Sequence, residues 1–199
     1  RTPMNAMLGF ASMAKGQTEN KKQLLTSLGH VETSGEHLLK LVNDVLDFAR
    51  IDSGLVHIEP EPINIPFLFY EMAENFRKKM DRKRIDFKTT LDLQNENIMC
   101  DALRMNQMWV QLLNNALKYT KNGGIIEFSM RQIAVKDDSY ATYIISVKDS
   151  GIGIEESAMP YLFQALETDV DIKEKGLKGT GLGLALVKRL VDLMGGSIT

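Results

Sequence analysis

A long helical repeat of apolar residues in the first third of the chain is the feature that most restricts the fold. Between residues 19 and 52, apolar or small side chains recur at alternating spacings of four and three residues. They are Leu24, Leu28, Val31, Gly35, Leu38, Val42, Val45 and Ala49. This spacing places them on one face of a single helix, and Leu41 and Phe48 widen that face. A lone helix cannot bury such a stripe, so partner helices are required.

A shorter apolar pattern over about residues 3–15 predicts a first helix, with Gly16 as its end and Thr18 as the N-cap of the long helix. Because the connection is short, the two helices should pack antiparallel. A hairpin buries one side only, and pairing two hairpins into a four-helix bundle is the simplest way to cover the rest. We therefore predict a homodimer formed through residues 3–53.

The pattern changes to mixed α/β after Gly54, which we take as a boundary between domains 1–54 and 55–199. We expect helices at 65–80 and 102–119, and a last helix ending at 195–196. We expect strands at 56–60, 85–93, near 98, around 126–130 and around 143–147, and a further strand at 197–199. The polar stretch 167–178 has no apolar periodicity and is expected to be a mobile loop. The fold class is therefore α+β.

Composition excludes several functional classes. The 199 residues are 44% hydrophobic and 25% charged with a net charge of −2, which is unlike the basic surface of a nucleic-acid binder. The single Cys100 reads as a small buried hydrophobe, and the scattered His30, His37 and His57 do not suggest a zinc site.

No apolar run approaches the ~20 residues that span a bilayer, so we expect no direct membrane contact from this segment and a cytoplasmic location for it. Both ends are interpreted as cuts through a longer protein, which leaves room for a membrane anchor outside the given residues.

The first chemical motif is Asp149-Ser150-Gly151-Ile152-Gly153, placed where a strand runs into a turn. A carboxylate there can accept a hydrogen bond from an exocyclic amine such as that of adenine. The two glycines allow the backbone to approach a flat ligand closely. The alternative reading is an ordinary Asp-x-Gly turn.

The second motif opens the final helix and consists of Gly179, Thr180, Gly181, Leu182 and Gly183. Glycines at a helix start leave backbone N–H groups bare, which suits phosphate. The run matches neither a dinucleotide fingerprint, because residue 184 is Leu, nor a P-loop. The alternative reading is a flexible helix cap.

The third motif lies late in the helix at 102–119 and includes Asn114, Asn115, Lys118 and Tyr119. An amide oxygen of Asn115 suits Mg²⁺, Lys118 could neutralise phosphate, and Tyr119 could cover an adenine ring. The alternative reading makes Asn115 and Lys118 surface residues and Tyr119 a core residue.

In this order, the three motifs resemble the nucleotide site shared by histidine kinases, gyrase, the Hsp90 chaperones and the MutL repair proteins. The N-terminal part selects one branch. Arg1-Thr2-Pro3-Met4-Asn5-Ala6 resembles the end of the histidine-kinase H-box, and residues 46–54 resemble the end of that family's dimerisation helix. The chain is similar to the core of a bacterial sensor histidine kinase.

The resemblance implies a dimeric four-helix bundle followed by an α/β sandwich of the Bergerat ATP-binding type. It implies that ATP is bound with Mg²⁺ on Asn115, with Asp149 recognising adenine and with Gln111 where the family often has Asn. It further implies a site whose remaining lining comes from Lys118, Tyr119, Gly151, Gly153, Ile154, Gly179, Thr180, Gly181, Leu182 and Gly183.

The activity implied is ATP-dependent phosphorylation of a histidine, followed by transfer to an aspartate of a response-regulator receiver domain. The phosphoacceptor would lie just before Arg1, with Thr2 one turn further on, where the family places a residue that aids dephosphorylation. None of the three histidines in the chain occupies that position.

Two other functions remain open from the sequence. An ATP-hydrolysing clamp of the gyrase or MutL kind is disfavoured by the heptad hairpin, and by Gln111 standing where a water-activating Glu would be needed. A degenerate kinase that only dimerises and binds nucleotide is disfavoured by the intact glycines and Asn115. Two departures are compatible with it: Gln111, and Leu166, which with Phe163 stands where the family usually has a pair of phenylalanines before the lid.

Overall fold

The chain divides into two compact units, Arg1–Ser53 and Gly54–Thr199, in a computed structural model. The structure describes residues 2–16, 20–133, 141–165 and 182–199. The loop predicted at 167–178 therefore lies outside the described residues. Among the described helices, none is both long enough and apolar enough to cross a membrane.

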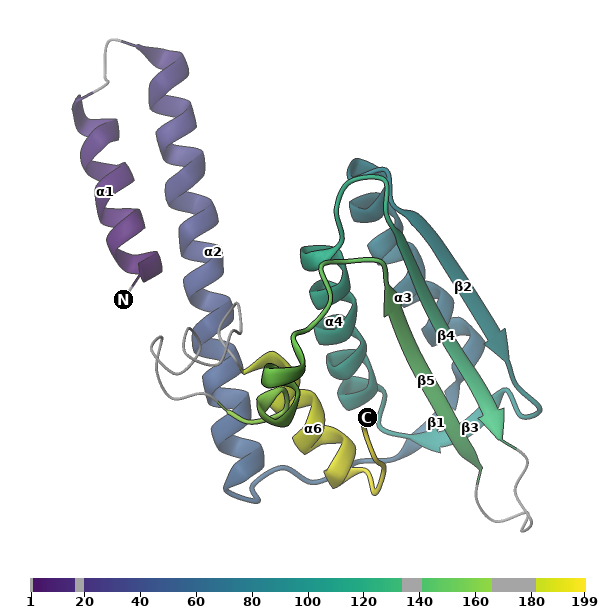
Figure 1. The fold of residues 1–199 in the computed structure, drawn as a ribbon. Coiled ribbons are helices and arrows are strands. Elements are labelled where there is room, and N and C mark those ends of the chain that lie inside the picture. Colours follow the sequence, from purple (N-terminus) through teal and green to yellow (C-terminus); the bar gives the residue numbers. More distant parts are fainter. Residues whose placement is uncertain (1, 17–19, 134–140, 166–181) are drawn as a thin grey trace. The chain divides into compact units, whose positions relative to one another are not determined.

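The first unit is the helical hairpin that the apolar spacing predicts (Figure 1). Helix α1 spans Thr2–Gly16 and helix α2 spans Lys21–Asp52. The side chain of Asn20 caps α2 by accepting a hydrogen bond from the Gln23 amide at 3.2 Å. The prediction of Thr18 as the N-cap was wrong, because the helix begins two residues later than the apolar pattern alone suggested.

Two contacts set the approach of α1 to α2. A Cβ atom on Gly35 would lie 3.5 Å from the Cε atom of Met7, so the missing side chain lets Met7 pack directly on the α2 backbone. One to two turns away, the rings of Phe10 and His30 stack with centroids 4.6 Å apart. His30 is thus a packing residue of the hairpin.

A single hairpin leaves much of the apolar stripe uncovered. Val42 is 47% exposed and Leu39 is 66% exposed, and other apolar side chains of α2 lie in the same range. These others are Leu25, Leu28, Val45 and Leu46. Exposure of this extent on a helix of 32 residues indicates a face that needs a further partner.

The second unit contains a three-stranded sheet in the order β2-β4-β5. Strand β2 (Asp86–Asp92) runs parallel to β4 (Ile125–Ile133), and β5 (Thr142–Asp149) runs antiparallel to β4. A separate antiparallel pair joins β1 (Glu61–Asn64) and β3 (Asn97–Cys100). The sheet is mixed, in agreement with the predicted fold class.

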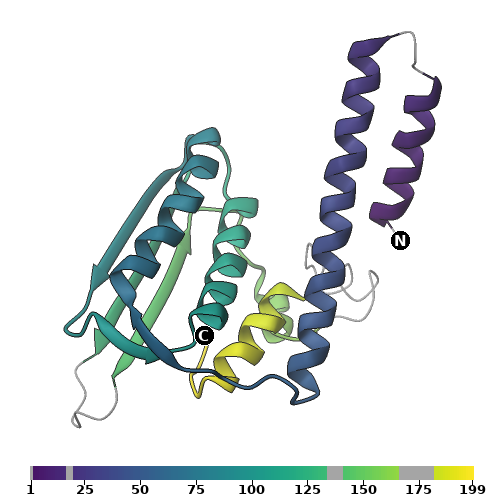
Figure 2. The same ribbon diagram turned by 180° about the vertical axis from the view of Figure 1, so that it is seen from behind.

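Helices α3 (Ile65–Arg82) and α4 (Ala102–Tyr119) cover one face of this sheet (Figures 1 and 2). A 3₁₀ helix, η1 (Glu156–Tyr161), and the last helix, α6 (Gly183–Leu193), complete the described elements. The sequence did not predict η1, because its six residues, with an internal Pro160, are too short to show a helical period.

The core lies between the two helices and the inner face of the sheet. On β4, Ile126, Phe128 and Met130 are fully buried, which is the period-two pattern of a strand with one covered face. Phe128 stacks on Phe69 of α3 at 4.3 Å and meets Trp109 of α4 edge-on at 5.5 Å. These aromatic contacts fix α3 and α4 on the sheet.

Two strand predictions were wrong. Residues 56–60 have no regular structure, and the strand begins at Glu61 because its register is set by β3, with Glu61 opposite Cys100. Residues 197–199 are not a strand, since no described strand pairs with them. Both stretches carry strand-forming residues, but a strand also needs a neighbour to accept and donate its hydrogen bonds.

Candidate functional site

Helix α4 carries the amide-bearing residues on one side. Its first turn is fixed by Asp101, whose carboxylate accepts hydrogen bonds from the amides of Arg104 (3.0 Å) and Glu59 (3.1 Å). Gln111, Asn115 and Tyr119 follow at intervals of four residues, which puts them along the same face of the helix. Gln111 is only 8% exposed and Asn115 is half-buried.

The Asp149 turn lies against the C-terminal end of this helix. The Asp149 carboxylate is exposed and accepts a hydrogen bond from the Gly151 amide at 2.8 Å. A Cβ atom on Gly151 would collide with that carboxylate and would lie 2.8 Å from the Tyr119 carbonyl oxygen. Residue 151 must therefore be glycine for the turn to approach α4 this closely.

Gly153 is required for a different reason. Its φ angle is +72°, a left-handed conformation that glycine adopts without steric cost. The neighbouring Ile152 and Ile154 are both exposed, so the turn presents apolar side chains and bare backbone to solvent. Such a surface suits a flat, partly apolar ligand.

The start of α6 lies next to Gln111. A Cβ atom on Gly183 would be 3.2 Å from the Gln111 side-chain oxygen. Leu182, the residue before the helix, makes no side-chain capping hydrogen bond. In general, the first amides of an α-helix have no intrahelical partner and attract anions. Gly179, Thr180 and Gly181 lie outside the described residues.

Lys118 and Tyr119 form a cation–aromatic pair at the end of α4. The Lys118 ammonium lies 4.8 Å from the centroid of the Tyr119 ring. Lys118 is exposed and Tyr119 is half-buried. The end of α4 that lies against the Asp149 turn therefore carries an exposed positive charge. This charge is available to an anionic ligand.

A metal ion at this site would have few protein ligands. The described residues contain no group of three or more His, Cys, Asp or Glu side chains able to hold a metal. Mg²⁺ commonly keeps several waters and substrate phosphates among its six ligands. The half-buried amide of Asn115, with Gln111 one turn before it, is a donor set that fits an ion held in this way.

The remaining predicted residues are spread over the first unit and the segment that follows it. Thr2 is the first residue of α1, His30 and His37 are on α2, and His57 lies between α2 and β1. Thr2, His30 and His37 belong to the first unit, whereas His57 belongs to the second unit together with α4 and the Asp149 turn.

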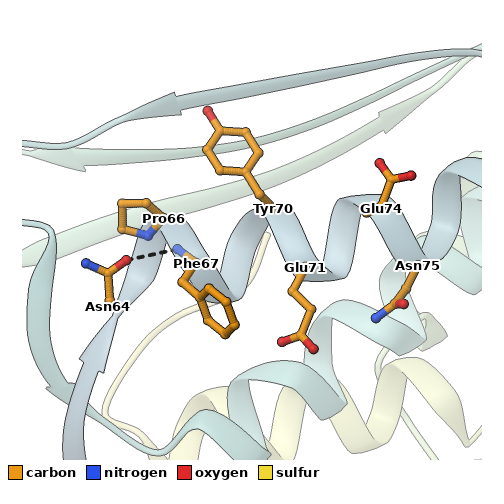
Figure 3. A pocket seen from close by; sticks show the side chains of 7 residues that line it. All are labelled: Asn64, Pro66, Phe67, Tyr70, Glu71, Glu74 and Asn75. Carbon is orange, nitrogen blue, oxygen red and sulfur yellow. Dashed lines mark hydrogen bonds between the residues drawn. The ribbon is translucent and has the colours of Figure 1, made fainter.

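A surface hollow of about 690 Å³ lies elsewhere, along α3. Figure 3 shows Tyr70 and Phe67 projecting on different sides of that helix, whose first turn is capped by Asn64 through a 3.0 Å bond from the Phe67 amide. Its other lining residues are Pro66, Glu71, Glu74 and Asn75. None of the sequence-predicted site residues that the structure describes borders this hollow.

Two family models match the chain. The "His Kinase A (phospho-acceptor) domain" matches residues 1–54, and the "Histidine kinase-, DNA gyrase B-, and HSP90-like ATPase" matches residues 100–199. The chain belongs to the sensor histidine kinases. It corresponds to their catalytic core, with a phosphoacceptor-type helical domain and an ATP-binding domain.

Similar proteins agree with this assignment. The autoinducer 2 sensor kinase/phosphatase LuxQ of Vibrio parahaemolyticus is 31% identical over 202 residues, covering 100% of this chain and 23% of that protein. The circadian input-output histidine kinase CikA of Synechococcus elongatus is 34% identical over 206 residues, covering 100% of this chain and 26% of that protein. The chain thus spans about a quarter of the length of these relatives.

Solved structures confirm the predicted fold. Full-length ShkA in complex with AMPPNP is 31% identical with a TM-score of 0.69, covering 99% of this chain and 39% of that one. Histidine kinase ThkA in complex with the response regulator protein TrrA has a TM-score of 0.72 at 21% identity, covering 98% of this chain and 52% of that one, and supports the fold alone.

Proposed function

We propose that this histidine-kinase core binds Mg²⁺-ATP along α4, between the Asp149 turn and the start of α6. The observation that carries this proposal is the pair of close approaches to one helix. Gly151 lies against the Tyr119 carbonyl, and Gly183 lies against the Gln111 side chain. The two glycine-containing motifs therefore flank the helical face on which Asn115 stands.

Each group has a distinct task in this site. The exposed Asp149 carboxylate accepts a hydrogen bond from the adenine amine while Gly151 and Gly153 let the ring approach the backbone. Asn115 would hold Mg²⁺, whose charge would offset that of the phosphates, and Gln111 would lie beside it one turn earlier on α4. Lys118 attracts the phosphates, and Tyr119 and Ile154 flank the adenine. By resemblance to the family, the phosphate end is assigned to Gly179, Thr180, Gly181, Leu182 and Gly183, of which the first three lie outside the described residues. Positioning and electrostatics then supply most of the rate.

The γ-phosphoryl group of ATP passes to a histidine of the helical hairpin, with ADP as the leaving group. It then passes from that histidine to an aspartate of a response-regulator receiver domain. We place the acceptor histidine just upstream of Arg1 in a longer protein, with Thr2 one turn further on as the residue that aids dephosphorylation. The structural neighbour ThkA was solved in complex with a response regulator protein, and a receiver domain of that class is the partner that we propose for this chain. The uncovered apolar face of α2 supports a homodimer through residues 3–53.

Nucleotide binding tests the site. The chain should bind ATP more tightly with Mg²⁺ than without it. Asp149→Asn removes the charged acceptor of a hydrogen bond, so affinity should fall roughly ten- to a hundredfold. Asp92→Asn, an exposed aspartate at the end of β2, is the matched control and should leave affinity unchanged. Unchanged affinity in Asp149→Asn contradicts the adenine assignment.

Phosphorylation tests the acceptor. Incubated with radiolabelled ATP, the given chain should not label at His30, His37 or His57, whereas a chain extended upstream through the H-box should carry acid-labile phosphate. Label on any of the three histidines would overturn the acceptor assignment. ATP binding without label in the extended chain would favour the degenerate module, and ATP hydrolysis without label would favour the clamp.

A further inference from the structure

The C-terminal end of α4 is held by a lysine from a different element. Lys83 follows α3, and its ammonium donates hydrogen bonds to the carbonyl oxygens of Leu117 (2.6 Å) and Thr120 (3.1 Å). We propose that Lys83 is a positioning residue of the nucleotide site, which fixes the last turn of α4 against the Asp149 turn. This inference rests on the proposed function of that site.

The positive charge of Lys83 lies at the C-terminal end of α4, where a cation stabilises a helix. The last carbonyl groups of an α-helix have no intrahelical partner and carry partial negative charge. An ammonium group that bonds them is a charge-assisted cap, stronger than a neutral hydrogen bond. Because Lys83 is 34 residues from Leu117 in the chain, this cap ties two separate helices together.

The backbone of Lys83 is itself anchored on both sides. Its amide donates to the Met80 carbonyl at 3.0 Å at the end of α3, and its carbonyl accepts from the Gly123 amide at 3.0 Å. Three residues further on, the Asp86 amide donates to the Gly124 carbonyl at 2.9 Å. Lys83 therefore reaches α4 from a fixed point.

The last turn of α4 transmits this position to the Asp149 turn through close contacts. Thr120 is 1% exposed, and a Cβ atom on Gly124 would lie 2.5 Å from its methyl carbon and 2.8 Å from the Ser150 hydroxyl. That hydroxyl accepts a hydrogen bond from the Ile125 amide at 2.8 Å, and the Ser150 amide donates to the Ile125 carbonyl at 3.0 Å.

These contacts couple the position of Lys83 to that of the residues that we propose to bind nucleotide. Tyr119, one residue before Thr120, places its carbonyl against Gly151, two residues after Asp149. If the last turn of α4 moves, then Lys118 and Tyr119 on one side and Asp149 on the other change their relative positions. None of the hydrogen bonds of Lys83 given above involves a side chain that we propose to bind nucleotide.

A methionine variant tests the proposal, because methionine has similar length and no charge. Lys83→Met should raise the dissociation constant for Mg²⁺-ATP roughly three- to tenfold, and Lys83→Arg should recover most of that affinity. Lys88→Met, on the exposed side of β2, is the matched lysine control and should have no effect. Ile63→Ala controls for a general loss of stability, because Ile63 is in β1, which lies near the start of α4 rather than near its last turn (Figure 1).

A second readout does not need nucleotide. In the nucleotide-free protein, Lys83→Met should shift the NMR amide signals of Thr120, Ser150 and Gly151 and speed their hydrogen exchange, whereas Ile63→Ala should not shift them. Unshifted signals, or an equal loss of ATP affinity in Ile63→Ala, would overturn the positioning role. If the unmutated chain binds no ATP but these amides respond, the proposed function has failed while the mechanical link stands.

Discussion

Arg84 holds an unusual backbone conformation directly after Lys83. Its φ angle is +54°, the only non-glycine residue with a positive φ in the described parts of the chain. Its amide donates to the Asp81 carbonyl at 2.9 Å, as the chain leaves α3 and turns into β2. The left-handed region costs an L-residue with a Cβ atom about 1–2 kcal/mol, and glycine is the usual residue where a helix ends in this way.

Arg84→Gly should therefore stabilise the protein. Relief of the backbone cost is partly offset by the greater freedom of glycine in the unfolded chain, so we expect a net gain of about 0.5–1 kcal/mol in the free energy of unfolding. Urea denaturation measures this change. Arg84→Ala keeps the Cβ atom and serves as the control, and an equal gain in that variant would show that the side chain, not the backbone, was responsible.

Cys100 makes stability sensitive to alkaline pH. Burial, followed by the charges of Asp101 and Glu61, raises the pKa of its thiol from 9.0 to about 11. Between these values the unfolded chain loses the thiol proton while the folded chain keeps it, so the unfolded state binds fewer protons and stability falls as pH rises. The stability linked to this thiol is fully present below about pH 9 and is lost toward about pH 11.

Cys100→Ala should flatten this alkaline loss. Free energies of unfolding measured by urea at a series of pH values should converge for the variant and the unmutated chain as pH rises above 9, the usual thiol pKa. Burial also raises the pKa of Tyr143, so part of the loss should persist in the variant. An identical pH dependence in both proteins would contradict the assignment to Cys100.

At the scale of elements, α2 is a helix with more apolar surface than α1 covers. The contacts of Met7 with Gly35 and of Phe10 with His30 place α1 alongside the first part of α2. Val42 and Val45 lie further along, and both are about half exposed. A second hairpin that covers this part of α2 would remove the exposed apolar surface from water.

Val42→Glu should shift the chain toward monomer, because dimerisation would bury an unpaired carboxylate; Leu38→Glu should act in the same direction. Light scattering across a concentration series measures the change. Asn43→Glu adds the same charge at the neighbouring exposed position and should leave the dimer intact. If the unmutated chain is monomeric, the measurement should be repeated on a chain extended upstream. A dimer of the extended chain would show that the first helix was too short, whereas a monomer would show that the bundle assignment is wrong.

At the scale of the whole molecule, the two units have different means of stabilisation. Residues 54–199 contain their own core, in which Phe69, Trp109 and Phe128 are fully buried. The hairpin has few fully buried apolar side chains and a large exposed apolar face. The second unit should therefore be stable by itself, whereas the stability of the first should depend on association.

Expressed alone, residues 54–199 should fold and bind Mg²⁺-ATP with an affinity within roughly threefold of the whole chain, since every proposed nucleotide contact lies in that unit. Its melting temperature should not depend on protein concentration. By contrast, residues 1–53 should melt at a temperature that rises with concentration. A second unit that fails to fold alone would show that the hairpin contributes to its stability.

The sequence by itself determined the elements whose pattern is local. Helix α4 runs over the predicted residues 102–119, because its apolar period and the capping Asp101 both act within a few residues. The alternation on β4 and the apolar repeat on α2 were predicted for the same reason. Three short motifs in a fixed order, together with the N-terminal residues 1–6 and residues 46–54, indicated the family. The assignment of the motifs to individual ligand contacts stays a prediction.

The tertiary structure decided whatever depends on which segments become neighbours. It placed β1 at Glu61–Asn64, since the hydrogen bonds that define a strand come from β3, more than 30 residues away. It brought the Lys83 ammonium to the end of α4, although the local sequence reads as an ordinary surface lysine after a helix. The periodicity of apolar residues shows which face of a segment is buried and which is exposed to water. It contains no information on which distant carbonyl groups a side chain will contact.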